Sequence, residues 1–292
     1  MVDLKLEANG LTFSAVGAGD PRGELVLFIH GFPDDLNTFE HQLTAVGDAG
    51  YHAVSVGLRG YEPSAQPQDG DYSLAAIATD VVGWMDALGA DKAHLVGHDW
   101  GAAVTYMAAA HHHERLLSAT ALAIPPLARI PEAIRRVPRQ FQRSWYMNWL
   151  QLPGLGPVST RAKDWFLLRH LWRSWSPGYM VDSGRWARVR KTFGQPGVLD
   201  AAIAYYRQNA TPPIMLGLKS TPATIPTPMA VPVLIINGVN DGCMDRRLYA
   251  KAIIEDDFPC GVRHEELDRA GHFVHWEQPD AVNEALIEHL GG

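Results

Sequence analysis

The feature that most constrains the fold of this chain is a short polar turn between two structured segments at residues 93–110. Residues 93–96 (Ala-His-Leu-Val) predict a buried strand, and the alanine-rich segment 102–110 predicts a helix. Between them, residues 97–101 read Gly-His-Asp-Trp-Gly, which places Asp99 at the centre of a turn with a glycine two positions away on either side. A strand that turns this sharply into a helix is typical of a parallel sheet whose strands alternate with helices.

The same alternation runs through most of the chain and indicates an α/β fold, a mainly parallel sheet flanked by helices. Between residues 126 and 227 strand patterns disappear, and prolines and glycines separate helical pieces. We therefore predict a core formed by 1–125 and 228–292 and an inserted all-helical lid, 126–227, above the carboxyl ends of the strands. The other strand candidates are 11–16, 25–29, 52–56, 119–123 and 231–237, and the helix candidates are 39–49 and 72–88.

Length and composition describe a large folded domain. The chain has 292 residues, 47% of them hydrophobic, which suits one α/β domain with an insertion and excludes general disorder. No secretory leader is visible, and no window approaches the roughly 18 apolar residues that cross a bilayer. Cys243 and Cys260 fall in different segments, as free thiols do in a reducing compartment. We expect a cytoplasmic protein without membrane insertion, and the sequence leaves a homodimer open.

Charge is unevenly distributed along the chain. Residues 128–191 contain 11 Arg and 2 Lys against 3 acidic residues, a net charge of +10 in a chain whose total is −7. A basic segment raises the question of nucleic acid or membrane surfaces. No nucleic-acid motif and no aromatic–basic repeat accompanies it. We expect no nucleic-acid partner, and a basic lid whose arginines either pair with the acidic core or stay solvated.

Asp99 has the chemistry of a nucleophile at this turn. A carboxylate attacks a saturated carbon that carries a leaving group, and the side chain becomes an ester that water must hydrolyse. The competing interpretation is a helix N-cap, for which aspartate is well suited. Two later residues favour catalysis: Asp241 follows the strand candidate 231–237, and His272 lies in the loop before the last helix. A histidine can activate water, and a carboxylate orients the imidazolium better than the neighbouring Asn240 can.

Taken as a set, the motifs resemble the lid-bearing α/β-hydrolases, and within them the epoxide hydrolases, over the whole chain. The segments that carry the resemblance are His-Gly-Phe-Pro-Asp at 30–34, Arg-Gly-Tyr at 59–61, Gly-His-Asp-Trp-Gly at 97–101, Gly-His-Phe at 271–273 and Glu-Gln-Pro at 277–279. The resemblance implies that Asp99 is the nucleophile, Asp241 the acid and His272 the base. It also implies that the backbone N–H groups of Phe32 and Trp100 form the oxyanion hole, and that no metal or cofactor takes part.

Two lid segments, 144–154 and 204–207, resemble the family stretches that contain the ring-opening tyrosines. Carried over, these are Tyr146 and Tyr206, although Tyr205 is adjacent and a shift of one residue would exchange the pair. A neutral phenol can donate a hydrogen bond and then a proton to the epoxide oxygen. The expected reaction joins a small apolar epoxide and water into a vicinal diol through a covalent ester.

Two other functions use parts of the same set. A haloalkane or haloacid dehalogenase employs the same aspartate, acid and histidine, but haloalkane dehalogenases usually have asparagine where Phe32 lies here. Haloacid enzymes resemble chains with arginines near the nucleophile, where this chain has Trp100. A non-catalytic ligand-binding protein could keep the fold, yet no member of the catalytic set is missing.

The run His-His-His at 111–113 is the one sequence pattern that suggests a metal site. Consecutive helical residues point about 100° apart, so three in a row cannot converge on one ion. We therefore predict a solvated helix end and no metal site there.

Overall fold

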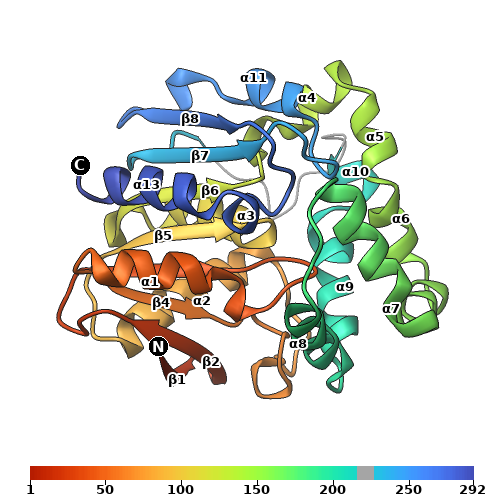
Figure 1. Ribbon diagram of the computed structural model, residues 1–292, viewed down its shortest axis with the longest axis horizontal. Coiled ribbons are helices and arrows are strands. Elements are labelled where there is room, and N and C mark those ends of the chain that lie inside the picture. Colours follow the sequence, from red (N-terminus) through yellow and green to blue (C-terminus); the bar gives the residue numbers. More distant parts are fainter. Residues whose placement is uncertain (216–226) are drawn as a thin grey trace.

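The computed structural model describes residues 1–215 and 227–292, and its centre is an eight-stranded sheet (Figure 1). The strands are β1 (Val2–Ala8), β2 (Leu11–Ala18), β3 (Leu25–Ile29), β4 (His52–Val56), β5 (Ala93–His98), β6 (Leu116–Leu122), β7 (Val233–Gly238) and β8 (Val262–Leu267). Their spatial order is β1-β2-β4-β3-β5-β6-β7-β8. Strands β3 to β8 run parallel, whereas β2 is antiparallel to β1 and β4. The predicted fold class is confirmed.

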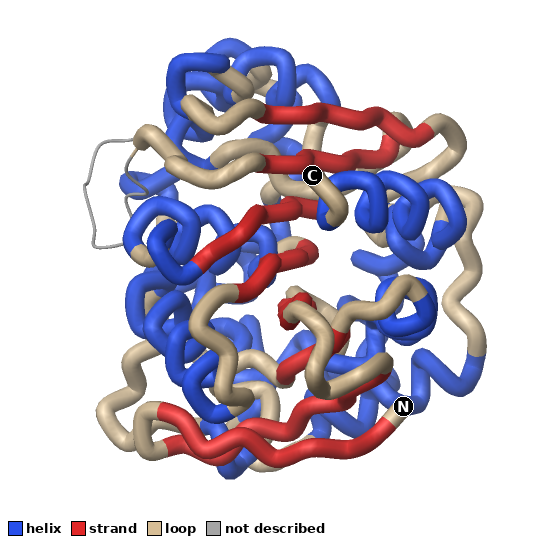
Figure 2. Tube along the Cα trace, turned by 90° about the vertical axis from the view of Figure 1, so that its left-hand side faces the viewer, coloured by secondary structure: helices blue, strands red, loops and turns tan. Residues whose placement is uncertain are grey.

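Helices cover both faces of the sheet (Figure 2). On one face the side chains of α1 (Glu40–Asp48) and α13 (Pro279–Leu290) pack with Phe28 and Val96, and on the other those of α2 (Leu74–Ala87) and α3 (Trp100–His111) pack with Leu27 and Leu95. This alternation explains why the central strands read as continuous apolar runs. The helices of this part of the chain are α1 (Glu40–Asp48), α2 (Leu74–Ala87), α3 (Trp100–His111), α11 (Tyr249–Ala252), α12 (Val274–Glu277) and α13 (Pro279–Leu290).

The described part of the segment between β6 and β7 consists of helices joined by loops, without a strand, and it stands beside the carboxyl ends of the strands (Figure 1). Its helices are α4 (Ile130–Arg136), α5 (Arg139–Arg143), α6 (Trp145–Gln151), α7 (Leu155–Trp175), α8 (Ser183–Gly194), α9 (Val198–Asn209) and α10 (Pro212–Met215). Helix α7 departs from helical geometry at 162–165. Residues 216–226 of the predicted lid lie outside the described residues, and the division into core and lid at 125 and 228 stays a prediction.

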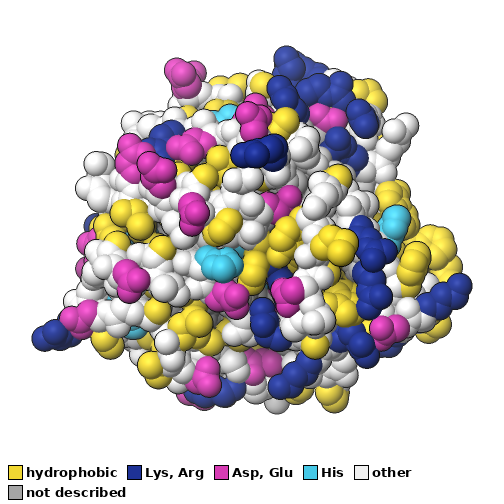
Figure 3. All heavy atoms as spheres, in the orientation of Figure 1, with side chains coloured by type: hydrophobic (Ala, Val, Ile, Leu, Met, Phe, Trp, Pro, Cys, Tyr) yellow, Lys and Arg dark blue, Asp and Glu magenta, His cyan; other side chains and the backbone are white. Residues whose placement is uncertain are grey.

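The basic lid segment contacts acidic groups of the core, as the charge pattern predicts. Arg129 pairs with Asp257 at 2.6 Å, and Arg188 lies 3.5 Å from Glu40. Other basic side chains remain at the surface over the lid helices, where Figure 3 shows them beside exposed hydrophobic groups. Within the two described ranges, every helix is too short or too polar to traverse a bilayer.

Candidate active site

Asp99 occupies a strained turn between β5 and α3. Its backbone has φ 52° and ψ −117°, a conformation that costs a non-glycine residue energy and recurs at functional sites. The flanking glycines permit it: a Cβ on Gly97 would collide with the backbone of Gly101, and one on Gly101 with the carbonyl group of Ile29. The turn therefore requires both glycines, and it lifts the Asp99 carboxylate above the end of the strand.

One backbone N–H group contacts this carboxylate, and a second belongs to the residue that follows Asp99 in the chain. The Phe32 N–H donates to Asp99 Oδ1 at 2.8 Å, so the loop after β3 already contacts the nucleophile position. The Leu58 N–H donates to His30 Nε2 at 3.0 Å and ties that loop to its neighbour. Trp100 is the first residue of α3, and an N–H at that position has no acceptor within its own helix. The two predicted oxyanion donors thus flank the same side chain.

His272 lies between two carboxylates. Its Nδ1 is 3.0 Å from Asp241 Oδ2, and its Nε2 is 3.4 Å from Asp99 Oδ2. The other oxygen of Asp241 accepts hydrogen bonds from the N–H groups of Cys243 and Met244, at 2.6 and 2.9 Å. Asp241 is thereby held by its own loop and orients the imidazole. The fold brings together the three polar residues that the sequence places on three separate loops.

The electrostatics of the two neighbouring histidines differ sharply. Burial disfavours charge on His272, but the charge and hydrogen bonds of Asp241 and Asp99 outweigh it and raise the His272 pKa to about 10. Burial and the nearby His272 lower the His98 pKa to about 3, and His98 Nε2 lies 3.0 Å from the backbone oxygen of His272. At neutral pH His272 is therefore an imidazolium and His98 is neutral.

The raised pKa of His272 predicts that stability falls as pH rises from about 7 to 10. The unfolded chain loses this proton near pH 6.5, whereas the folded protein keeps it until about pH 10. Stabilisation from this group is complete below pH 6.5 and is lost towards pH 10, with a slope of about −1.4 kcal/mol per pH unit. Urea unfolding across this range measures the slope, and Asp241→Asn should make it shallower. An equal slope in the variant would contradict the assignment.

Tyr146 of α6 and Tyr206 of α9 face each other across the site. Their ring centroids are 5.9 Å apart, and both rings line the same cavity as Asp99 and Trp100. Burial raises the pKa of each phenol well above its usual range, so both are protonated donors at neutral pH. The Tyr146 hydroxyl lies 3.5 Å from Cys243 Sγ, and the Tyr206 hydroxyl makes no well-formed hydrogen bond within the described chain, with Trp100 and Tyr146 as its polar neighbours.

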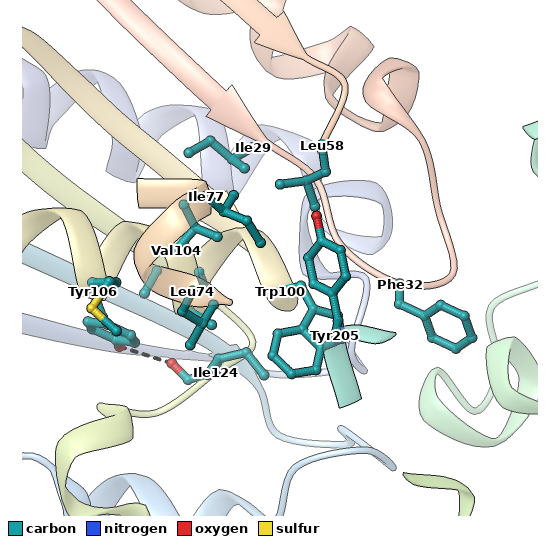
Figure 4. Close-up of a cluster of buried hydrophobic side chains, with 14 of the residues drawn as sticks. Ile29, Phe32, Leu58, Leu74, Ile77, Trp100, Val104, Tyr106, Ile124 and Tyr205 are labelled. Atoms are coloured by element: carbon teal, nitrogen blue, oxygen red, sulfur yellow. Dashed lines mark hydrogen bonds between the residues drawn. The ribbon is translucent and has the colours of Figure 1, made fainter. Parts of the chain in front are cut away.

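Tyr205 has a different environment from its neighbour. Its hydroxyl donates to the backbone oxygen of Arg59 at 2.7 Å, and Tyr205 is not among the residues that line the cavity, whereas Tyr206 is. Figure 4 shows this hydroxyl pointing toward the Leu58 segment. The geometry therefore favours Tyr206 over Tyr205 as the second phenol of the site.

The cavity above Asp99 has a volume of about 310 Å³ and is mostly apolar. Its polar lining includes Asp99, the two phenols, Gln140, Ser144 and Asn209. This arrangement suits a small apolar ligand with one polar atom to be held. The apolar wall is formed by Leu74, Ala103, Ile124, Leu127, Ile130, Ile134, Met147, Ile214 and Met215.

Cys243 is a site residue that the sequence patterns do not single out. The sequence predicts a free thiol without a role, and the thiol is free, but it is buried and lines the cavity. Its position two residues after Asp241 is the available signal, because a residue so close to the acid lies in the same loop.

Arg185 of α8 is a second residue whose place only the structure shows. Its guanidinium is buried, pairs with Asp34, and donates to Thr38 Oγ1 at 2.7 Å. It also lies 3.7 Å from the ring centroid of Trp276. These contacts attach the lid segment to the loop that contains Phe32. The positive charge of Arg185 is therefore buried and paired, not exposed to solvent.

Comparison with known proteins places these features in a family. The family model described as "alpha/beta hydrolase fold" matches residues 24–279. The AB hydrolase superfamily protein YfhM of Bacillus subtilis is 30% identical over 98% of this chain and 96% of its own length. Epoxide hydrolase 4 of Mus musculus is 30% identical over 96% of this chain and 76% of its own, and epoxide hydrolase A of Mycobacterium tuberculosis is 28% identical over 98% and 96%.

Solved structures agree with this placement. A variant of an epoxide hydrolase from Bacillus megaterium, in complex with its naphthyloxy-propanediol product, is 25% identical, with a TM-score of 0.85 over 99% of this chain and 100% of that one. Epoxide hydrolase A from Mycobacterium thermoresistibile is also 25% identical, with a TM-score of 0.77 over 100% and 98%. The chain belongs to the alpha/beta hydrolase fold family and, within it, to the epoxide hydrolases.

Proposed function

We propose that this protein hydrolyses small apolar epoxides to vicinal diols, using Asp99 as a covalent nucleophile. The observation that carries the proposal is the placement of two buried phenols and the Asp99 carboxylate around one cavity, with His272 Nε2 3.4 Å from that carboxylate. The names of the relatives support the same activity. Each chemical step can be written with the protein's own groups and water.

In the first step, an oxygen of Asp99 attacks an epoxide carbon and the carbon–oxygen bond of the ring breaks. The departing alkoxide is a poor leaving group, so it needs donors at the moment that charge develops. Tyr146 and Tyr206 supply two hydrogen bonds from the lid side, and one phenol transfers its proton, which solvent then replaces. The product is a hydroxyalkyl ester on Asp99.

The second step follows from the change in charge at Asp99. Esterification removes one of the two carboxylate charges that raise the pKa of His272, so the imidazolium releases its proton more readily. Neutral His272 then accepts a proton from water at Nε2, and the water attacks the ester carbonyl. The N–H groups of Phe32 and Trp100 stabilise the oxyanion, and the diol leaves while Asp99 is regenerated. Asp241 keeps its charge and the imidazole orientation throughout.

Release of diol from a panel of alkyl, aryl and aryloxymethyl epoxides tests this function, with chloroalkanes and haloacids assayed in parallel for halide. We expect diol from the apolar epoxides, since the cavity wall is apolar and a relative binds a naphthyloxy diol. Halide release without diol would favour the dehalogenase alternative. That alternative is the weaker one, because a halide needs no proton and therefore no phenol pair.

The two lid phenols can be tested against a neighbour of the same type. Tyr146→Phe and Tyr206→Phe should each lower kcat/KM for epoxides by about a hundredfold or more, since each removes a donor to the developing alkoxide. Tyr205→Phe is the matched control: it loses the hydrogen bond to the Arg59 carbonyl, about 1 kcal/mol of stability, while kcat/KM stays within a few-fold. An equal loss of activity in all three variants would contradict the assignment.

We also propose a cytoplasmic location, in keeping with the two free thiols, one of them on the surface at Cys260. For assembly, a homodimer stays a prediction. The exposed side chains of Phe141, Trp145 and Trp149 on α5 and α6 offer an apolar surface for it.

A further inference from the structure

We propose that Asp99, His272 and Cys243 together bind a soft divalent cation such as zinc or cadmium, and that the bound cation switches the hydrolase off. The three side chains come from three different loops, after β5, β8 and β7. A carboxylate oxygen, an imidazole nitrogen and a thiol sulfur lie within 4.8 Å of one another, and all three residues are buried. Within residues 1–215 and 227–292, they are the group whose ligand atoms converge in this way.

The spacing of two of the donors already fits a metal. A tetrahedral zinc ion bound at about 2.0–2.2 Å by nitrogen and oxygen holds those two atoms about 3.4 Å apart. His272 Nε2 and Asp99 Oδ2 are separated by 3.4 Å. A sulfur ligand at about 2.3 Å lies about 3.6 Å from its neighbours, and because the three ligand atoms lie within 4.8 Å of one another, a small shift of Cys243 Sγ completes the geometry. The thiol lines the cavity, and within residues 1–215 and 227–292 its side-chain hydrogen bond is a long one of 3.5 Å to the Tyr146 hydroxyl, so the cavity offers it space to move.

The surroundings of the histidine are also those of a metal ligand. Asp241 holds Nδ1 at 3.0 Å, and a carboxylate on the far nitrogen orients histidine ligands and strengthens them as donors. The opposite nitrogen, Nε2, makes only a long contact of 3.4 Å to Asp99 Oδ2 and no shorter hydrogen bond within the described chain. Nε2 is therefore free to bind a cation shared with Asp99 and Cys243, both of which line the cavity.

Occupation of this site would stop catalysis for a simple reason. The cation takes the nucleophile and the base of the proposed mechanism as its own ligands, and it stands where the epoxide must bind. Binding exchanges the protons of the imidazolium and the thiol for one doubly charged ion, so the net charge of the buried cluster is unchanged. The donor set selects zinc or cadmium over magnesium and calcium, which require several oxygen ligands.

Cadmium titration of the purified protein tests the site, with thiolate-to-metal ultraviolet absorption as a readout that needs no catalysis. Wild type should bind one Cd²⁺ with that absorption and lose diol release, and a chelator should restore the activity. Cys243→Ser should lose the absorption and require at least about tenfold more Zn²⁺ or Cd²⁺ for half-inhibition, measured against its own metal-free rate. Cys260→Ser, which alters the exposed thiol, should behave as wild type. Magnesium should have no effect.

Several outcomes would overturn the proposal. Absorption that survives in Cys243→Ser and disappears in Cys260→Ser would assign the cation to the surface thiol. Binding of the cation at Cys243 without any loss of diol release would contradict the proposal that the cation stops catalysis. Excess diol should also protect wild type from Cd²⁺, a measurement that needs no variant to fold, and lack of protection would place the cation outside the cavity. A protein that binds Cd²⁺ through Cys243 but hydrolyses no epoxide would refute the proposed function and leave the metal site intact.

Discussion

Replacement of Asp99 by asparagine is expected to lower the initial rate of diol release by about a thousandfold or more. The amide has nearly the shape of the carboxylate, so the turn and the hydrogen bond from the Phe32 N–H can persist, but a neutral amide is a poor nucleophile. Asparagine also tolerates the positive φ of this position better than most residues do. A time course of diol release on a small aryl epoxide, with thermal unfolding as the control for folding, measures the effect.

A slow return of activity is part of the same expectation. Water activated by His272 can attack the new amide as it attacks the ester, and this hydrolysis regenerates the aspartate. The time course should then show a lag, and intact-protein mass spectrometry should show a gain of about one mass unit, the difference between the two side chains. Full initial activity in the variant would mean that Asp99 is not the nucleophile.

Replacement of His272 by glutamine has the second large effect, because it separates the two steps. Asp99 and the lid phenols remain, so the epoxide should still open, whereas no base is left to activate water for the ester. Steady-state turnover should fall by about a thousandfold or more, while one equivalent of epoxide is consumed rapidly. Mass spectrometry after rapid mixing should find the protein heavier by the mass of one epoxide.

The adduct should map to the peptide that contains residues 97–101, and the double variant Asp99→Asn with His272→Gln should form none. Consumption of epoxide by the single variant without any adduct would indicate direct attack of water on the epoxide. That result would rule out the covalent mechanism, whereas the family assignment would still hold.

The sequence predicts local structure best where a short segment determines its own backbone geometry. The turn around Asp99 is such a case, because the glycines at 97 and 101 permit a backbone that other residues cannot adopt. Buried strands such as β3 and β7 were equally clear from their apolar runs. The edge strands β1 and β8 are absent from the candidates because neither forms a continuous apolar run. Strand β1 (VDLKLEA) has the alternation of a half-buried strand, whereas β8 (VRHEEL) places four polar residues between its two apolar ends.

The order of loops along the chain also allows the meeting of Asp99, Asp241 and His272 to be predicted from the sequence. Parallel strands present their carboxyl ends at one edge of the sheet, so residues that follow different strands meet there. Their hydrogen-bonded arrangement, with His272 between the two carboxylates, follows from that rule.

The sequence by itself thus determined the fold class, the strained turn and the set of loops that meet at the site, because each depends on local pattern and on the direction of the strands. Only the tertiary structure decided which face of the lid helices points inward. Neighbouring residues on a helix point about 100° apart, so the packing of α9 alone separates Tyr206 in the cavity from Tyr205 against the Arg59 loop. The burial of Arg185 against Asp34 and of Cys243 beside His272 was decided in the same way, by the contact of lid and sheet.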